Sequence, residues 1–217
     1  MADITLPVTA HGGHDAHAGD DHADAGHGAH YTSTGLSNNK LAMWLFLGSE
    51  CLLFGGLIST YMLYRGRTSR GPHPDAVYSI PFTSVSSFVL LMSSLTMVLA
   101  VSAAKDGDIR RTRVWLSTTA LLGSTFVGGQ IFEFTTFYRK GLGFTTSLFG
   151  SSFYTLTGFH GVHVTVGVVL LLSLVAMTLR GGVTGDRAEV VELIGLYWHF
   201  VDIIWIVIFT LVYLIPA

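Results

Sequence analysis

The sequence predicts an all-α membrane protein: a bundle of five transmembrane helices that follows a disordered, histidine-rich N-terminal tail. Of the 217 residues, 50% are hydrophobic and 12% are charged, whereas an ordinary soluble domain carries about 25% charged residues. The mean hydropathy is +0.54. Five apolar stretches approach or exceed the roughly 20 residues that cross a bilayer. The net charge of −2 argues against a nucleic-acid partner, which would require a basic surface.

The first 38 residues differ in composition from the rest and are predicted to be disordered. They are rich in His, Gly, Ala and Asp, with almost no large apolar side chain after Leu6, so they cannot bury enough surface to become ordered. Histidines recur here at spacings of three to five, and His11, His14 and His17 could bind zinc or copper weakly. The alternative is a solvated tail without a specific ligand.

The five-helix domain is predicted to cover residues 39–217. Its apolar stretches run over residues 41–64, 82–104, 114–137, 149–179 and 193–215. The fourth is the longest, so it must tilt or extend past the membrane. Small residues four positions apart, such as Gly55 with Ser59 and Ser124 with Gly128, would let the helix backbones approach closely.

Lysine and arginine in the connecting segments predict the orientation. If the N-terminus is cytoplasmic, the inner segments hold seven of these cations and the outer segments hold five. Cytoplasmic loops carry the excess of Lys and Arg. This asymmetry favours a cytoplasmic N-terminus and an external C-terminus.

Ionisable side chains inside the predicted spans are the strongest sign of a function. They are Glu50, Glu133, His160, His163, His199 and Asp202. A charged group near the bilayer centre costs roughly 2.5–3.5 kcal/mol on insertion scales. Each of these side chains is therefore expected to point into the bundle, toward a partner subunit or into a wet cavity.

Glu50, His199 and Asp202 are expected to share one buried polar layer. His199 and Asp202 are three positions apart, so they lie on one face of a helix. At 1.5 Å per residue, all three lie roughly 9–14 Å from the inner ends of their helices. Pairing of imidazole with carboxylate at that depth would reduce the desolvation cost of each group.

His160 and His163, in GFHGVHV, raise the question of a metal or haem site, because imidazole is the commonest metal ligand. No other predicted span carries a matching histidine pair, and no Cys-x-x-Cys-His motif is present. We therefore expect hydrogen-bonded structural roles and no cofactor in this chain. No phosphate loop, nucleophile elbow or HExxH motif occurs. From the residues alone, a structural subunit and a proton or ion transporter explain the sequence equally well.

Four motifs resemble subunit III of the haem–copper respiratory oxidases, of the cytochrome c oxidase type. They are LFLGSECLLFGG, GGQIFEF, GFHGVHVTVGV and YWHFVDIIWIVIFTLVYL. They occur in the family's order, and the resemblance covers about residues 40–217, with the tail outside it. Five spans match the shorter bacterial form, which lacks the first two helices of the seven-helix mitochondrial protein.

The resemblance implies an accessory subunit of a proton-translocating oxidoreductase in the bacterial plasma membrane. The chain itself would hold no catalytic centre, since haem and copper belong to the partner subunits I and II. It would pack on subunit I, hold phospholipids between its helices, and support proton uptake and the durability of the active site. Cytochrome c or another respiratory complex, as in a respirasome, would be a further partner.

The resemblance also assigns individual residues. Glu50 of GSECLLF corresponds to the family's buried carboxylate that reacts with carbodiimides, and His199 and Asp202 match its terminal motif. Two related proteins remain as alternatives: a quinol oxidase subunit III and a nitric oxide reductase accessory protein. Quinol oxidases typically carry Asp after Ser at the position of Glu50, so Ser49 followed by Glu50 favours the cytochrome c type. A stand-alone transporter would need inverted repeats or broken helices, and no internal repeat is evident.

Overall fold

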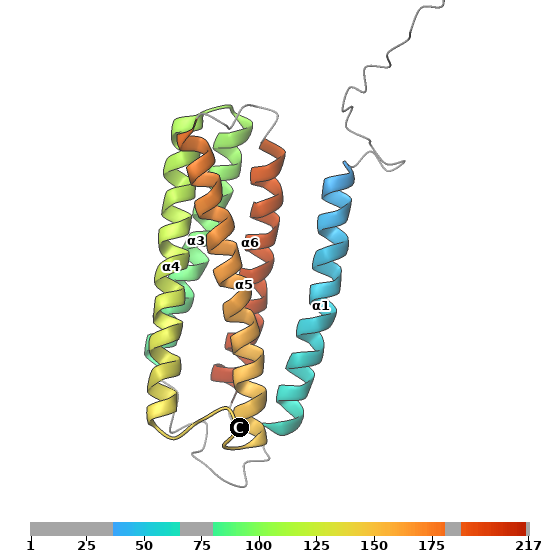
Figure 1. The fold of residues 1–217 in the computed structure, drawn as a ribbon, viewed down its shortest axis with the longest axis vertical. Helices are drawn as coiled ribbons and strands as arrows, with labels where there is room; N and C mark the ends of the chain where they lie inside the picture. Colours follow the sequence, from blue (N-terminus) through green and yellow to red (C-terminus); the bar gives the residue numbers. More distant parts are fainter. Residues whose placement is uncertain (1–36, 66–79, 181–187, 216–217) are drawn as a thin grey trace, which may run out of the picture.

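The computed structural model describes residues 37–65, 80–180 and 188–215, and this part of the chain is entirely helical (Figure 1). Its elements are α1 (Asn38–Tyr64), α3 (Ile80–Lys105), α4 (Ile109–Arg139), α5 (Leu148–Leu179), α6 (Ala188–Phe209) and a π-helical turn, η2 (Thr210–Leu214). The predicted all-helical fold is thus confirmed for the described residues. The predicted disordered tail, with His11, His14 and His17, lies outside them apart from its last two residues.

Helices α3, α4, α5 and α6 form a ring in which each helix packs on the two beside it. Helix α1 packs against α5 and α6 from outside this ring (Figure 1). It buries only Leu47, Phe54 and Tyr61, which recur every seventh residue and so form one narrow stripe. The remaining faces of α1 are available to lipid or to another protein.

Four of the helices are long and apolar enough to cross a membrane: α1, α3, α5, and α6 together with η2. Helix α4 is as long, with 31 residues, but Ser, Thr, Gly and charged residues interrupt its apolar sequence. The expectation of five spans is therefore confirmed for four helices, and the fifth span remains a prediction.

Short polar residues and glycines define the helix ends. The side chains of Asp108 and Ser147 accept hydrogen bonds of 3.0 Å from the backbone N–H three residues later, which begins α4 and α5. Gly107 has a φ of +73° in the tight turn between α3 and α4, and Gly141 has a φ of +87° just after α4. Only glycine adopts this conformation without strain.

Two tryptophans on α6 determine how that helix is rotated in the ring. The buried indoles of Trp198 and Trp205 donate hydrogen bonds to the hydroxyls of Ser93 and Ser87 on α3, at 3.0 Å and 2.8 Å. The tryptophan that comes first in the sequence bonds to the later serine, because α3 and α6 run antiparallel. This rotation also brings His199 into contact with α3.

Candidate functional site

The predicted intramembrane polar side chains occupy four separate environments. The structure places Glu50 with His163, His160 among aromatic rings, His199 and Asp202 beside Ser94, and Glu133 with Thr83. No hydrogen bond or ion pair in the described part of the chain joins Glu50 to His199 or Asp202. The structure thus gives the three members of the expected layer different partners: His163 for Glu50, and Ser94 for His199 and Asp202.

Glu50 of α1 faces His163 of α5, with Oε2 lying 3.2 Å from Nε2. Both side chains are largely buried, at 14% and 16% exposure. The other imidazole nitrogen, Nδ1, lies 2.7 Å from the carbonyl oxygen of Phe159. The hydroxyl of Tyr197 on α6 donates to the carbonyl oxygen of His163 at 3.0 Å. Three helices therefore hold this pair in place.

The neighbours of His163 determine where its protons lie. A carbonyl oxygen only accepts hydrogen bonds, so Nδ1 must carry a proton. Nε2 then either accepts a proton from a neutral Glu50 or, in the imidazolium form, donates to an ionised Glu50. The two side chains lie close together near the middle of α1, although no hydrogen bond of standard geometry from the described residues reaches Oε2 of Glu50.

His160 is fully buried and lies among aromatic rings. Its imidazole stacks on the indole of Trp205, with ring centroids 4.9 Å apart, and meets the edges or faces of Phe54 and Phe126. Neither ring nitrogen has a hydrogen-bond partner among the described residues. The expected hydrogen-bonded role is therefore not what the structure shows for His160, whose contacts are aromatic.

His199 and Asp202 approach α3 rather than one another. Nδ1 of His199 lies 2.6 Å from the hydroxyl oxygen of Ser94. The same hydroxyl also lies beside the carboxyl of Asp202, although no hydrogen bond of standard geometry reaches either carboxyl oxygen from the described residues. Asp202 is only 3% exposed. Ser94 is thus the shared neighbour of the two side chains.

Glu133 lies toward the end of the ring where α3 begins and α4 ends. The hydroxyl of Thr83 donates to its Oε1 at 2.5 Å, and Tyr213 of η2 is a second hydrogen-bonding neighbour. All three side chains are buried. The π-helical turn therefore carries a residue that links the C-terminal end of the chain to α4.

Sequence reasoning did not identify Ser94 or Thr83 as partners. A signal was present: the segment that forms α3 contains eight Ser or Thr residues within 80–105 besides its large apolar side chains. Four of them, Thr83, Ser87, Ser93 and Thr96, are buried. Hydroxyls on the buried face of an otherwise apolar span indicate hydrogen-bond partners on neighbouring helices.

A second unpredicted feature is a charged cluster at the end of the bundle where α6 begins. Glu192 pairs with Lys40 at 3.2 Å and with Lys105 at 3.7 Å. Ser37 donates a hydrogen bond to Glu189. These contacts connect the starts of α1 and α6 with the end of α3.

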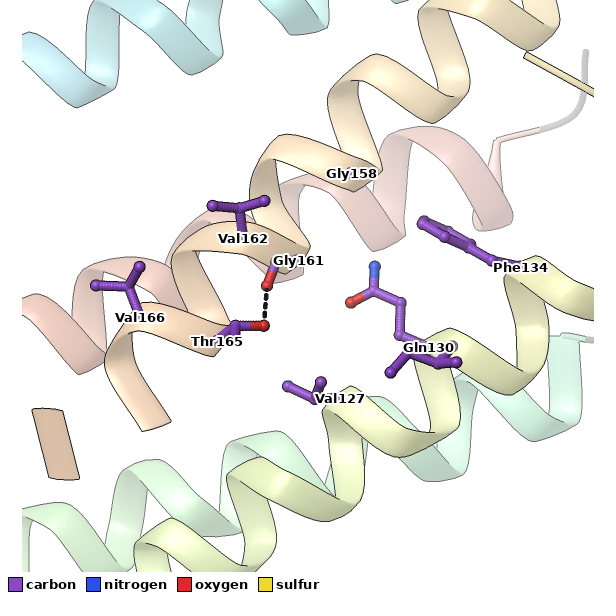
Figure 2. Close-up of a pocket in the computed structure, with 9 residues that line it drawn as sticks. Val127, Gln130, Phe134, Gly158, Gly161, Val162, Thr165 and Val166 are labelled. Carbon is purple, nitrogen blue, oxygen red and sulfur yellow. Dashed lines mark hydrogen bonds between the residues drawn. The ribbon is translucent and has the colours of Figure 1, made fainter. Parts of the chain in front are cut away.

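An open groove of about 310 Å³ lies between α4 and α5 (Figure 2). Its lining residues are Val127, Gln130, Ile131, Phe134, Gly158, Gly161, Val162, Thr165 and Val166. Figure 2 shows Gln130 extending from α4 toward α5, where its Nε2 donates to the carbonyl oxygen of Thr157 at 3.3 Å. The hydroxyl of Thr165 is bonded to the carbonyl of Gly161. The groove is therefore an apolar surface with few free polar groups.

No group of three or more His, Cys, Asp or Glu side chains that could hold a metal ion occurs among the residues described. His160 and His163 are on one helix, but they face different neighbours: the indole of Trp205 and the carboxyl of Glu50. The arrangement brings acid, imidazole and hydroxyl groups close together, as in the pair of Glu50 with His163 and the contact of His199 with Ser94.

Comparison with known proteins identifies the family. The family model described as cytochrome c oxidase subunit III matches residues 20–216, so the match begins within the predicted tail, earlier than the motifs indicated. Cytochrome c oxidase subunit 3 of Bacillus sp. (strain PS3) is 40% identical over 82% of this chain and 86% of its own length. Quinol oxidase subunit 3 of Bacillus subtilis (strain 168) is 38% identical over 81% and 86%.

A third relative extends over most of both sequences. Cytochrome bo(3) ubiquinol oxidase subunit 3 of Pseudomonas aeruginosa is 36% identical over 93% of this chain and 96% of its own length. The relatives thus include both cytochrome c and quinol oxidase subunits. With four helices able to cross a membrane, the chain is a multi-pass membrane protein that belongs to the cytochrome c oxidase subunit III family.

Proposed function

We propose that this chain is the accessory, non-redox subunit III of a bacterial haem–copper terminal oxidase of the cytochrome c type. The observation that carries the proposal is the match to subunit III proteins over more than four-fifths of the chain. The protein would lie in the plasma membrane with its N-terminus in the cytoplasm and its C-terminus outside. Ser49 followed by Glu50 supports a cytochrome c donor over a quinol.

Subunits I and II are the proposed partners, with subunit I against the exposed side of this chain. The free faces of α1 support such packing. A Cβ atom built at Gly48 or Gly55 meets no atom within 4 Å, and the nearby Leu52 is 80% exposed. Small and apolar residues on an open face allow a second helix to approach closely in lipid.

Phospholipid is the proposed ligand of the subunit. The groove between α4 and α5 supports this assignment, because its length lies along two helices and its lining is apolar (Figure 2). An acyl chain would fill it without leaving a buried polar group unpaired. Gly158 and Gly161 leave space in the groove for a ligand, because neither residue has a side chain that would fill it.

Support for proton uptake and for the durability of the active site is proposed for the pair of Glu50 and His163. The two side chains are largely buried between α1 and α5, and Nε2 of His163 lies 3.2 Å from Oε2 of Glu50. Haem and copper would lie in the partner subunits. Replacing His160 or His163 with Gln should then leave the haem and copper content of the purified complex unchanged. Loss of a metal centre, with the partner subunits still present, would contradict a non-redox role.

The decisive experiment is affinity purification of the full-length chain from its native membranes. We expect haem absorbance and the two larger oxidase subunits to purify with it, together with oxidation of reduced cytochrome c. The control is an unrelated membrane protein carrying the same tag. Oxidation of quinol in place of cytochrome c would move the assignment to the quinol oxidases. A haem-free single chain that moves protons in vesicles would overturn the proposal in favour of a transporter.

A further inference from the structure

We propose that Asp202, Ser94 and His199 form a proton-exchange chain between the interior of the ring and a groove between α3 and α6. The inference does not depend on the electron donor or on the partner subunits. It rests on three observations in this part of the chain: a buried carboxyl, a hydroxyl that lies beside two titratable groups, and an opening that reaches one of those groups.

The carboxyl of Asp202 is the inner end of the chain. It is 3% exposed, and no described residue donates a hydrogen bond of standard geometry to it. An ionised carboxylate held there without a partner would be costly, because the site is shielded from bulk solvent and no salt bridge from the described residues reaches it. A buried acid that lacks fixed partners is a place where a proton can be bound and released.

Ser94 links this carboxyl to the imidazole. Its hydroxyl lies 2.6 Å from Nδ1 of His199 and beside Asp202. A hydroxyl has a single proton to donate. When Nδ1 is unprotonated, Ser94 donates to it and gives nothing to Asp202. When Nδ1 carries a proton, Ser94 accepts from His199 and is free to donate to Asp202.

A groove of about 150 Å³ between α3 and α6 forms the outer end. Three polar side chains line it: His199, Lys105 and Glu192. The rest of the lining is apolar and consists of Val98, Val101, Gly195 and Leu196. The volume is large enough for several water molecules, and the three polar side chains supply the partners that such water requires. Because Nδ1 faces Ser94, Nε2 is the nitrogen of His199 that can exchange a proton with this groove.

The ionisable groups around this path that have described contacts come from α1, α3, α5 and α6. Lys105 on α3 and Glu192 on α6 line the groove and pair with each other at 3.7 Å, and Lys40 of α1 pairs with the same carboxylate at 3.2 Å. On α5, His160 stacks on Trp205 and His163 pairs with Glu50. Among the described residues, Asp202 and His199 are thus the titratable groups that Ser94 connects.

The transfer conserves every proton. A hydrated proton in the groove binds Nε2 of His199, the proton on Nδ1 passes to the hydroxyl oxygen of Ser94, and the original hydroxyl proton passes to the carboxylate of Asp202. One proton has moved inward, the imidazole has changed tautomer, and no bond between heavy atoms has changed. The reverse sequence returns the proton to the groove.

Infrared difference spectroscopy of the full chain, in the complex with which it purifies, tests the proposal. The band of the protonated carboxyl is assigned by subtracting Asp202→Asn from wild type, and its shift is followed after transfer into D₂O. We expect prompt exchange in wild type, slowed about tenfold or more in Ser94→Ala and in His199→Phe, because relay groups commonly accelerate proton transfer by larger factors. Val98→Phe, which narrows the groove without removing a polar group, should also slow exchange.

Ser84→Ala is the matched control, because this hydroxyl on the same helix is exposed, is bonded to the carbonyl of Ile80 and lies outside the chain. It should leave the exchange rate of Asp202 unchanged. Equal exchange rates in Ser94→Ala, Ser84→Ala and wild type would overturn the proposal. The absence of a protonated Asp202 band at every pH tested would overturn it as well. Neither result bears on whether the chain purifies with haem, so the proposed function is tested separately.

Discussion

The indole of Trp198 occupies the space that a side chain at Gly123 would require. A Cβ atom built at Gly123 of α4 would lie 2.5 Å from Cη2 of Trp198, and one built at Gly167 of α5 would lie 2.8 Å from the other edge of the same indole. The ring is fully buried and donates to Ser93. Two glycines on different helices therefore form the slot that holds this tryptophan.

Gly123→Ala is expected to destabilise the folded chain by roughly 1–3 kcal/mol, the usual cost of overpacking a well-filled core. The indole cannot move away, because Gly167 confines its other side and Ser93 holds its N–H. Thermal unfolding of the purified protein measures the effect. Gly128→Ala on the same helix is the control, since a Cβ there meets nothing within 4 Å. Equal stability of the two variants would show that the slot is not tightly packed.

Ser87→Ala should destabilise the bundle by roughly 1–3 kcal/mol, because it leaves the buried N–H of Trp205 without an acceptor. Ser84→Ala removes a hydroxyl from the same helix that is exposed and bonded only to the carbonyl of Ile80. That variant should be close to neutral. Denaturation of both variants, followed by tryptophan fluorescence, compares them directly. A Ser87→Ala protein as stable as Ser84→Ala would mean that the indole finds another acceptor.

The helices could be predicted closely from the sequence, whereas the partners of the polar side chains could not. The apolar stretch 149–179 became α5 (Leu148–Leu179), with one boundary identical and the other one residue away. Length and hydropathy contain that information. A rise of 1.5 Å per residue predicts a depth for Glu50, but depth does not determine which way a side chain points around the helix axis.

Helix rotation decided the pairings, and it depends on contacts that are far apart in the sequence. The stripe of Leu47, Phe54 and Tyr61 orients α1 toward α5 and α6, so Glu50 faces His163 in place of His199. On α6, the bonds of Trp198 and Trp205 to α3 turn His199 toward Ser94. The spacing of His199 and Asp202 correctly predicted a shared face of one helix, but not the hydroxyl on that side.

Glu50→Gln is expected to abolish labelling of this chain by an apolar carbodiimide while leaving its assembly nearly normal. Carbodiimides attack protonated carboxyls, and Glu50 is a largely buried carboxyl that lies 3.2 Å from His163. Glutamine retains the shape of the side chain and a donor for Nε2 of His163. Glu192→Gln is the control, because that carboxylate pairs with two lysines at the helix ends. Unchanged labelling of Glu50→Gln would assign the reaction to another acid.

Glu192→Gln should have a small effect on stability, below about 1 kcal/mol, because exposed ion pairs gain little over their hydration. Its side chain is 27% exposed, and those of Lys40 and Lys105 are 30% and 55% exposed. Any loss should shrink further as salt is added, since mobile ions screen such pairs. Melting temperatures at low and high salt test this. A large loss that salt does not reduce would show that the cluster acts through close packing of α1.

Thr83→Val should be clearly more damaging than Glu192→Gln, although each replacement removes a contact of a glutamate. The hydroxyl of Thr83 donates to Glu133 at 2.5 Å, and both residues are buried, with exposures of 1% and 6%. Valine has nearly the same shape, so the change removes the donor without creating a cavity.

Losing a buried hydrogen-bond partner costs roughly 1–3 kcal/mol, and Tyr213 remains as a neighbour that limits the loss. Thr125→Val on α4 is the control, because its exposed hydroxyl bonds only the carbonyl of Leu121. Unfolding of the three variants should rank Thr83→Val as the least stable. If Thr83→Val unfolds together with Thr125→Val, then Tyr213 alone satisfies Glu133, and η2 rather than α3 holds this end of the bundle.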